Sequence, residues 1–250
     1  MVDLVLPHQR RRACGLRVCG HLWVGRLVTA RGAPEPGASA FRKAISFCPT
    51  GWATTGIYVK PLDETTWSDF ARLAEKHNGV WGGCWCMAFH PEGVGRNTTA
   101  SQNRASKERR VREGQAHAAL VYDGSSAVGW CQFGPPDELP RIKHKRAYLE
   151  GLTDLPDWRI TCFFVDRDYR RKGVAAAALK GALREIARLG GGTVESYPED
   201  AAGRSVAGTF LHNGTVSMFE SQGFRRIRRL GKSHWVVTKV VPGPSHDGPS

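Results

Sequence analysis

Hydrophobic and polar positions alternate along the chain with two periods, and the longer period predicts helices. Apolar residues recur three and four positions apart between Trp67 and His77 and again between Leu179 and Leu189, which is the spacing of one face of an α-helix. Three glycines at 190–192 end the second of these segments, because glycine readily adopts the conformation that follows a helix C-terminus. With a polar helix and a short helix added, the predicted helices span residues 67–77, 101–113, 173–189 and 215–221.

Shorter apolar runs between the helices predict β-strands. Residues 159–166 are almost continuously apolar, as in a strand that is buried on both faces. Turn residues at 123–126 and 231–232 separate two pairs of strands and indicate hairpins, whereas the polar segment 135–156 is predicted as a long loop. The predicted strands are 57–62, 118–122, 127–133, 159–166, 193–198, 224–230 and 234–241. This order of elements favours an α/β fold with a mixed sheet and helices on both faces.

Composition and charge divide the chain into regions. The content of 41% hydrophobic and 24% charged residues is ordinary for a globular protein, and no apolar run reaches the roughly 18 residues that a membrane-spanning helix needs. The net charge of +13 is unevenly spread, since residues 1–50 hold eight Arg or Lys against two Asp or Glu. We predict a basic extension over residues 1–56, disordered or non-native, a folded domain over 57–241 and a flexible tail over 242–250.

The cysteines indicate the compartment and raise the question of a metal. Seven cysteines at irregular spacing are not typical of a disulfide scaffold and favour a reducing cytoplasm. Cys84 and Cys86, with His77 and His90, have the residue types of a zinc site. The one-residue gap is shorter than usual and no second pair follows. We therefore predict no metal site. Metal binding by Cys84 and Cys86 stays open as the alternative.

The junction between the buried strand and the following helix has the features of a phosphate-binding turn. A strand, a tight turn with Gly173 and a helix start follow one another here, and the unpaired amides at a helix N-terminus attract anions. The side chains of Arg170, Arg171 and Lys172 add positive charge. The pattern is neither a P-loop nor a dinucleotide fingerprint. An ordinary basic turn on the surface is the alternative.

These residues resemble the GNAT superfamily of N-acetyltransferases. The pyrophosphate signature of that family is Arg or Gln, two residues, Gly, one residue, then Gly or Ala, and 170–175 fit every position. The strand before it, the helix after it and the short helix that ends in Gly223-Phe224 also fit. The resemblance covers about residues 57–240 and is strongest over 160–224. It implies a GNAT-like splayed sheet, in which the fourth and fifth strands diverge.

The resemblance also implies a co-substrate and a reaction. Acetyl-CoA would place its pyrophosphate on the amides of residues 171–175 and pair its pantetheine arm with the strand backbone. The acetyl group would pass directly to a primary amine in a ternary complex. The implied cofactor-binding residues are Phe163, Phe164, Val165, Arg170, Arg171, Lys172, Gly173, Val174 and Ala175.

The catalytic groups are less well indicated. The tyrosine that donates a proton in many family members corresponds to Phe219, which has no proton to give. Tyr197 and His212 are candidates for the missing proton donor. Glu195, a carboxylate in an apolar strand, is our first candidate for the base that accepts a proton from the amine. Glu150 and Asp154 are weaker ones.

A second class of function stays open at this point. The chain would then be a non-enzymatic basic module of the same fold that binds CoA or nucleic acid. Clustered arginines without interleaved aromatic residues argue against a nucleic-acid groove. The acceptor, whether a small molecule or a protein amine, and the oligomeric state, including a homodimer, are not determined by the sequence.

Overall fold

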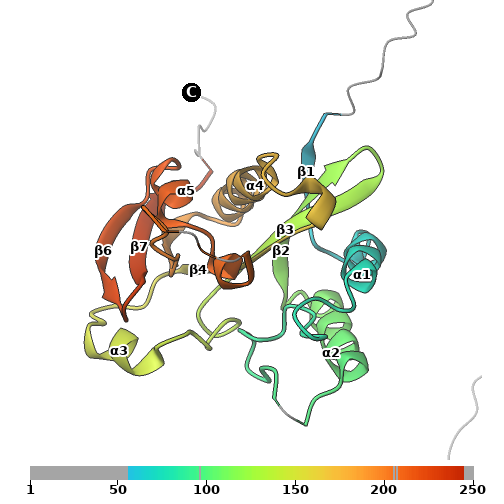
Figure 1. Cartoon of the computed structure of the whole chain (residues 1–250), viewed down its shortest axis with the longest axis horizontal. Helices are drawn as coiled ribbons and strands as arrows, with labels where there is room; N and C mark the ends of the chain where they lie inside the picture. The colour runs from blue at the N-terminus through green and yellow to red at the C-terminus, as the bar shows by residue number, and fades with distance from the viewer. Residues whose placement is uncertain (1–55, 96, 205, 207, 245–250) are drawn as a thin grey trace, which may run out of the picture. The chain divides into compact units, whose positions relative to one another are not determined.

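The computed structural model describes residues 56–95, 97–204, 206 and 208–244. The predicted basic extension, apart from Gly56, and the last six residues of the predicted tail lie outside the described residues. The elements, in chain order (Figure 1), are β1 Tyr58–Pro61, α1 Trp67–Lys76, α2 Ala100–Arg112, β2 His117–Asp123, β3 Ser126–Gly134, α3 Lys145–Glu150, β4 Trp158–Val165, η1 Arg167–Tyr169, α4 Val174–Arg188, β5 Gly192–Ser196, η2 Gly208–Asn213, α5 Val216–Glu220, β6 Arg225–Leu230 and β7 His234–Val241.

The strands form one mixed sheet in the order β1-β2-β3-β4-β5-β7-β6. β4 and β5 pair in parallel, and the other neighbours pair antiparallel. Both predicted hairpins are present as β2–β3 and β6–β7. The structure therefore confirms the predicted mixed α/β fold.

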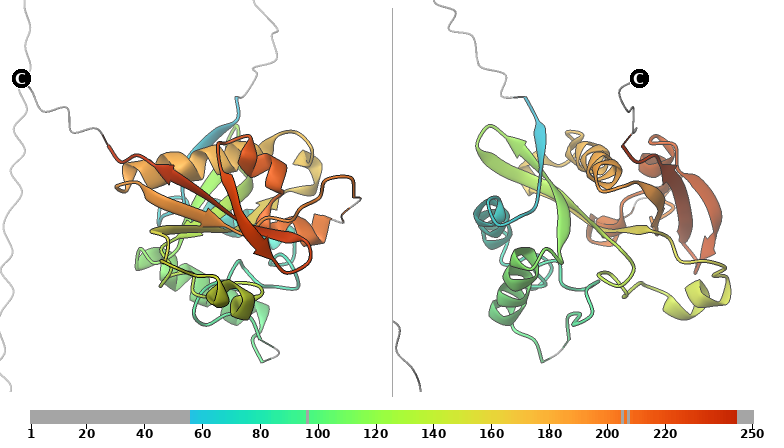
Figure 2. Two further views of the ribbon diagram at one scale, coloured as in Figure 1. Left: turned by 90° about the vertical axis from the view of Figure 1, so that its left-hand side faces the viewer. Right: turned by 180° about the vertical axis from the view of Figure 1, so that it is seen from behind.

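Helices cover both faces of the sheet, as predicted (Figure 2). On one face, α1 packs Phe70 against Trp130 of β3, with ring centroids 4.6 Å apart. On the other face, Leu179 and Ile186 of α4 are fully buried in a second core with Val121 and Cys131 of the sheet. Each such buried apolar side chain contributes about 1.5–3 kcal/mol relative to exposure. The two cores hold the sheet between them.

The sheet splits between β4 and β5, and this split positions the site. Only Trp158, Arg159 and Ile160 of β4 pair with β5, at Val194–Ser196. Opposite β3 the register shifts so that Gln132 faces Cys162 while Phe133 faces Ile160. Thr161 is therefore an extra residue, and a bulge of this kind bends and twists a strand. Beyond it, the remaining residues of β4 have no β5 partner within the described part of the sheet.

The prediction of a continuous loop over residues 135–156 is wrong, because α3 lies within it (Figure 1). A helix of six residues is too short to show a periodic pattern or to be stable alone. Tertiary contacts stabilise it instead. Arg228 donates hydrogen bonds from its guanidinium to the carbonyls of Ala147 and Tyr148, at 3.1 and 2.6 Å, and the Tyr148 side chain is buried.

Candidate functional site

The turn between β4 and α4 presents an uncapped helix N-terminus. Gly173 is the N-cap residue of α4 with φ +79°, and no side chain forms a capping hydrogen bond there. Arg171, two residues earlier, also has a positive φ of +60°. Successive amides in such a turn point to one side and form a concave anion site, and the first-turn amides of a helix have no intrahelical partner. A Cβ at Gly173 would meet no atom within 4 Å, so no neighbouring group crowds this residue on its Cβ side.

Asp166 holds this turn against α1. Its carboxylate accepts hydrogen bonds from Lys76 Nζ at 2.6 Å and from the Asp168 amide at 3.1 Å, and His77 Nε2 lies 3.4 Å away. Burial by itself would raise the pKa of Asp166, but the hydrogen bonds from Lys76 and the Asp168 backbone lower it overall. The charged carboxylate thereby ties the end of α1 to the start of the turn.

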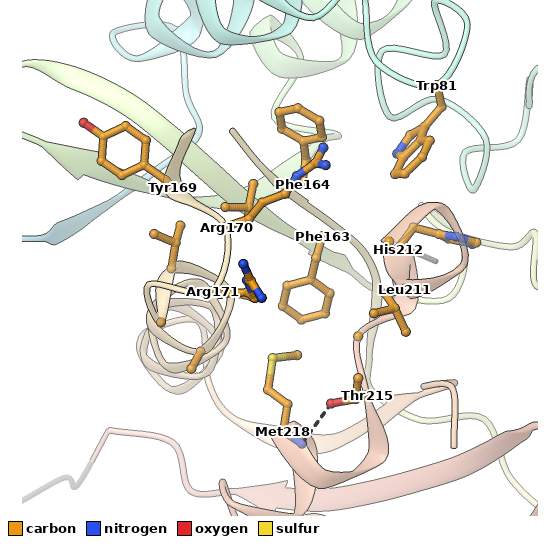
Figure 3. Close-up of a pocket in the computed structure, with 17 residues that line it drawn as sticks. Trp81, Phe163, Phe164, Tyr169, Arg170, Arg171, Leu211, His212, Thr215 and Met218 are labelled. Carbon is orange, nitrogen blue, oxygen red and sulfur yellow. Dashed lines mark hydrogen bonds between the residues drawn. The ribbon is translucent and has the colours of Figure 1, made fainter. Parts of the chain in front are cut away.

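A cavity of about 430 Å³ extends from this turn along the part of β4 that pairs with β3 but not with β5, called the unpaired part of β4 below (Figure 3). Trp81 lies on one side of it and Met218 on the opposite side. Its volume is within the range of small-molecule sites, about 300–1,000 Å³. It is lined by Trp81, Phe163, Phe164, Val165, Tyr169, Arg170, Arg171, Gly173, Val174, Ala175, Ala176, Gly208, Leu211, His212, Gly214, Thr215 and Met218. We call it the first cavity.

Eight of the nine residues that the sequence assigned to the co-substrate line the first cavity. The exception is Lys172, whose ammonium lies 5.1 Å from the centre of the Tyr169 ring. The sequence did not identify the wall formed by η2 and α5, including Leu211 and Met218. No motif marks these residues, because only the fold brings them opposite β4.

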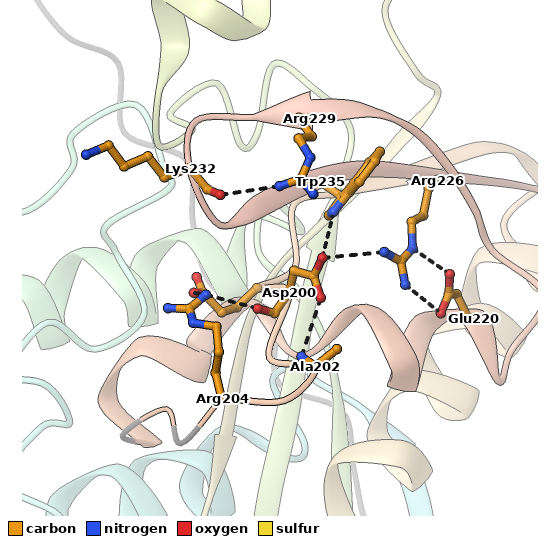
Figure 4. A network of polar contacts seen from close by, with 9 residues as sticks. Asp200, Ala202, Arg204, Glu220, Arg226, Arg229, Lys232 and Trp235 are labelled. Carbon is orange, nitrogen blue, oxygen red and sulfur yellow. Dashed lines mark hydrogen bonds and ion pairs between the residues drawn. The ribbon is translucent and has the colours of Figure 1, made fainter.

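A network of polar contacts anchors the loop that leads from β5 to this wall (Figure 4). The Asp200 carboxylate accepts a hydrogen bond from Trp235 Nε1 at 3.0 Å. It also forms an ion pair with Arg226 at 3.4 Å. Arg226 also pairs with Glu220 of α5, at 2.7 Å. The hydrogen bond from Trp235 and the neighbouring arginine lower the pKa of Asp200. The loop is thus joined to β6, β7 and α5 before it enters η2.

A second cavity, of about 340 Å³, adjoins the first. The two share Trp81 and His212 in their walls. The second is lined by Trp81, Cys84, Cys86, Ala88, Phe89, Val94, Cys162 and His212. It lies on the face of the sheet that carries α1 and α2, since Cys84, Cys86 and Cys162 belong to that core. The shared residues mark the place where the two cavities meet.

The three catalytic candidates separate into two places. His212 lines both cavities, and its ring lies 6.4 Å from that of Trp81. Glu195 and Tyr197 are buried together instead, where Glu195 Oε2 accepts hydrogen bonds from Tyr148 Oη at 2.7 Å and Tyr197 Oη at 3.0 Å. Neither lines either cavity. Of the two weaker candidates, Glu150 forms an exposed ion pair with Arg146 at 2.9 Å.

The environment of Glu195 leads to a test of its role. Burial raises the pKa of Glu195 above 4.5, against the lowering effect of hydrogen bonds from Tyr148 and Tyr197. A raised folded-state pKa means that the stability contribution is complete below pH 4.5 and is lost as the pH rises through the folded pKa. We expect Glu195→Gln to remove this loss, so that its melting temperature rises relative to wild type between pH 4.5 and 8.

Turnover of the same variant tests catalysis separately. We expect kcat to stay within about twofold of wild type if Glu195 holds α3 and takes no proton from substrate. A fall of about 100-fold or more, the size expected when a general base is lost, would restore Glu195 as the base. Tyr148→Phe, which removes one hydrogen bond to the same oxygen, is the control for a purely structural effect.

Phe219, at the position where the resemblance implies a tyrosine that donates a proton, is a residue of the core. Its ring is fully buried and packs edge-on against Phe163 and Phe224, with centroid distances of 5.9 and 4.9 Å. Met218, its neighbour, lines the first cavity in its place. Neither side chain carries an acidic proton.

The histidines considered for zinc have other partners. His90 and Lys107 are 3.0 Å apart, and His77 lies beside Asp166. Within the described residues, no group of three or more His, Cys, Asp or Glu side chains is arranged to hold a metal ion. None of the helices described combines the length and the apolar character that crossing a bilayer requires.

Comparisons with known proteins give a family and several distant structures. No curated protein matches the chain. An acetyltransferase from Salmonella typhimurium, solved with acetyl-CoA, is 15% identical over 78% of this chain and 98% of its own, with a TM-score of 0.42. A mosquito arylalkylamine N-acetyltransferase-like protein is 11% identical over 74% of this chain and 100% of its own, with a TM-score of 0.46. A Corynebacterium glutamicum protein described as histone acetyltransferase HPA2 and related acetyltransferase is 12% identical over 77% of this chain and 99% of its own, with a TM-score of 0.45.

These likenesses are too remote to carry an argument about activity. The family comparison is different in kind, because the model of the acetyltransferase (GNAT) family matches residues 84–206. That segment includes the split between β4 and β5, the turn at Gly173 and most of the cysteine-lined cavity. The chain therefore belongs to the GNAT family of acetyltransferases.

Proposed function

We propose that this protein is an N-acetyltransferase that moves an acetyl group from acetyl-CoA to a primary amine by direct attack in a ternary complex. The observation that carries the proposal is the course of the first cavity. It begins at the uncapped N-terminus of α4, follows the unpaired part of β4 and ends at His212. An anion site, an extended channel and a titratable group thus occur in the order that a long anionic thioester requires.

The turn at one end of the cavity fits a pyrophosphate. The amides from Arg171 to Ala175 would donate hydrogen bonds to its oxygens, and the helix dipole favours negative charge at that position. Gly173 leaves the approach open, and Arg170 and Arg171 line the cavity beside it. Lys172 would contribute charge from outside the cavity wall.

The unpaired part of β4 fits the pantetheine arm. Phe163, Phe164 and Val165 line the cavity there, and an exposed strand edge binds an extended ligand through backbone hydrogen bonds, as in β-augmentation. The thioester would then lie toward His212, where the two cavities meet. Acetyl-CoA supplies the activated acetyl group, and the protein supplies its alignment.

The reaction needs one proton to be removed and one bond to be exchanged. The nitrogen of the neutral amine attacks the thioester carbonyl carbon, a C–N bond forms, the C–S bond breaks and CoA leaves as a thiolate. We assign His212 as the group that accepts the amine proton, since it is the one catalytic candidate from the sequence that lines both cavities. Neither Met218 nor Phe219 can protonate the thiolate, which is a stable enough anion to leave without a proton.

We further propose a cytoplasmic location. The four described cysteines, Cys84, Cys86, Cys131 and Cys162, are all free and buried thiols. A reducing compartment preserves thiols in this state.

Calorimetry with acetyl-CoA tests the proposed function directly. We expect one site per chain with micromolar affinity, about −8 kcal/mol, and release of free CoA when a suitable amine is added. The alternative, a basic module without activity, predicts binding that any polyanion competes for and that falls steeply with salt. Heparin and a single-stranded oligonucleotide at two salt concentrations are the controls, and competition by them without thioester preference would refute the enzyme.

A further inference from the structure

The second cavity has the properties of an acceptor pocket for an uncharged body. Its described walls consist of aromatic, aliphatic and thiol side chains together with His212, and they include no carboxylate. Phe89, Cys84 and Cys86 are buried, whereas Trp81 and Val94, each about two-fifths exposed, stand where the cavity meets solvent. Burial raises the pKa of the Cys84 thiol to about 12, so this thiol stays uncharged at neutral pH.

A buried cation lies behind the thiols. Lys107 is fully buried, and its Nζ lies 3.0 Å from His90 Nε2 and 3.0 Å from Gln132 Oε1. Burial and the neighbouring Lys107 lower the pKa of His90 to about 2, so this imidazole is neutral. Its Nδ1 lies 3.2 Å from the Glu138 carbonyl and donates to it, which leaves Nε2 to accept from Lys107.

The negative groups around Lys107 already have partners. Glu138, a buried carboxylate that acts electrostatically on Lys107, lies outside the cavity wall and pairs with His117 at 2.7 Å. Lys107 acts electrostatically on Cys84, Cys86 and Cys162. Burial would raise the pKa of Cys86, but the Cys162 thiol and Lys107 lower it overall, and any negative charge on that sulfur is matched by the ammonium. Burial already lowers the pKa of Lys107. A cationic group in the cavity would face this ammonium or displace its proton, and both cost free energy.

The position of the second cavity determines which end of a bound amine lies near the reacting thioester. It meets the first cavity at Trp81 and His212, where the proposed function places the thioester. An amine at this junction would have His212 beside it and the rest of its molecule among Cys84, Phe89 and Cys162. A volume of about 340 Å³ suits a small organic molecule.

From this we propose that the second cavity is the acceptor site, and that it takes a primary amine with a compact apolar body, aromatic or branched aliphatic, that carries no second positive charge. The inference rests on the proposed function for the position of the acetyl group. The composition of the wall and the buried Lys107 support it independently. Polyamines, aminoglycoside-like polycations and lysine-rich peptides are excluded as preferred acceptors.

Matched amines test the proposal. Hexylamine and 1,5-diaminopentane have the same number of heavy atoms and differ by a terminal methyl against a terminal ammonium. We expect kcat/KM for hexylamine to exceed that for the diamine by about 100-fold, since a charge loses its hydration in an apolar pocket, and 2-phenylethylamine to be a good acceptor. Faster acetylation of the diamine, of spermidine or of a lysine peptide would overturn the proposal.

Two variants locate the site. Ala88 is an exposed residue of the cavity wall, and we expect Ala88→Phe to raise KM for 2-phenylethylamine about tenfold by filling the space, with the Kd for acetyl-CoA unchanged. We expect Val94→Asp to shift preference toward the diamine. Ala147→Phe, on the exposed face of α3, is the matched control. An unchanged KM in Ala88→Phe would place the acceptor elsewhere.

The two proposals fail in different ways. If acetyl-CoA binds and a polycation is the better acceptor, the proposal of an apolar amine acceptor is refuted and the proposed acetyltransferase activity is retained. If acetyl-CoA does not bind, the proposed function falls, and calorimetry with 2-phenylethylamine alone still decides whether the cavity takes an apolar amine. Binding that Ala88→Phe abolishes would support it, and no binding would refute it.

Discussion

Gly173→Asp is expected to weaken acetyl-CoA binding by about 100-fold or more, which corresponds to about 2.7 kcal/mol. The carboxylate would lie at the N-terminus of α4, where it would accept the free amide hydrogens and repel the diphosphate. A Cβ at this position meets no atom within 4 Å, so the cost to the fold is the strain of a side chain at φ +79°, which Asp and Asn tolerate better than most residues. Calorimetry with acetyl-CoA measures the effect.

Gly173→Asn is the matched control. Asn has nearly the same shape as Asp and also tolerates a positive φ, but it carries no charge. We expect it to lose about tenfold in affinity through competition for the amides, so that the difference between the variants reports charge alone. Melting temperatures within a few degrees of wild type establish that both are folded. Equal affinities for Asp, Asn and Gly would mean that the diphosphate does not bind at this turn.

His212→Gln is expected to lower kcat by about 100-fold or more, the usual range for loss of a general base. Glutamine retains hydrogen-bonding capacity but does not titrate near neutral pH. We therefore also expect the acidic limb of the kcat/KM profile, set by a histidine in the free enzyme, to disappear in the variant. Steady-state kinetics with 2-phenylethylamine between pH 5 and 9 measure both.

His144→Asn is the control for this experiment. His144 lies outside both cavities and has a positive φ of +57° that Asn also adopts. We expect its rate and pH profile to match wild type. If His212→Gln keeps the wild-type rate and the same acidic limb, another group removes the proton, and the Glu195→Gln measurement then becomes decisive.

The local pattern was a good guide wherever one short segment carries the information. The run of apolar residues from Ile160 to Val165 predicts a buried strand, and Gly173 followed by Val174 and Ala175 predicts a helix start. Both are where the structure has them, because strand burial and helix initiation depend mainly on neighbours in sequence. Eight of the nine residues assigned to the co-substrate consequently line one cavity.

The pattern was a poor guide wherever a residue's role depends on what faces it. Glu195 on an apolar strand resembled a catalytic carboxylate, yet Tyr148 of α3 and the nearby Tyr197 hydrogen-bond to it away from both cavities. α3 was missed since Arg228, 80 residues later, holds its carbonyls. Trp81 and Met218 belong to no motif, and only the fold sets them on opposite sides of one cavity (Figure 3).

By itself, the sequence determined the order of the strands and of the helices other than α3, the mixed sheet and the turn at Gly173, because periodicity and helix-end chemistry act over a few residues. The tertiary structure alone decided how far β4 and β5 separate, which histidine lies where the cavities meet and that the described walls of the second cavity contain no carboxylate. These properties arise from contacts between segments distant along the chain, which no local spacing encodes.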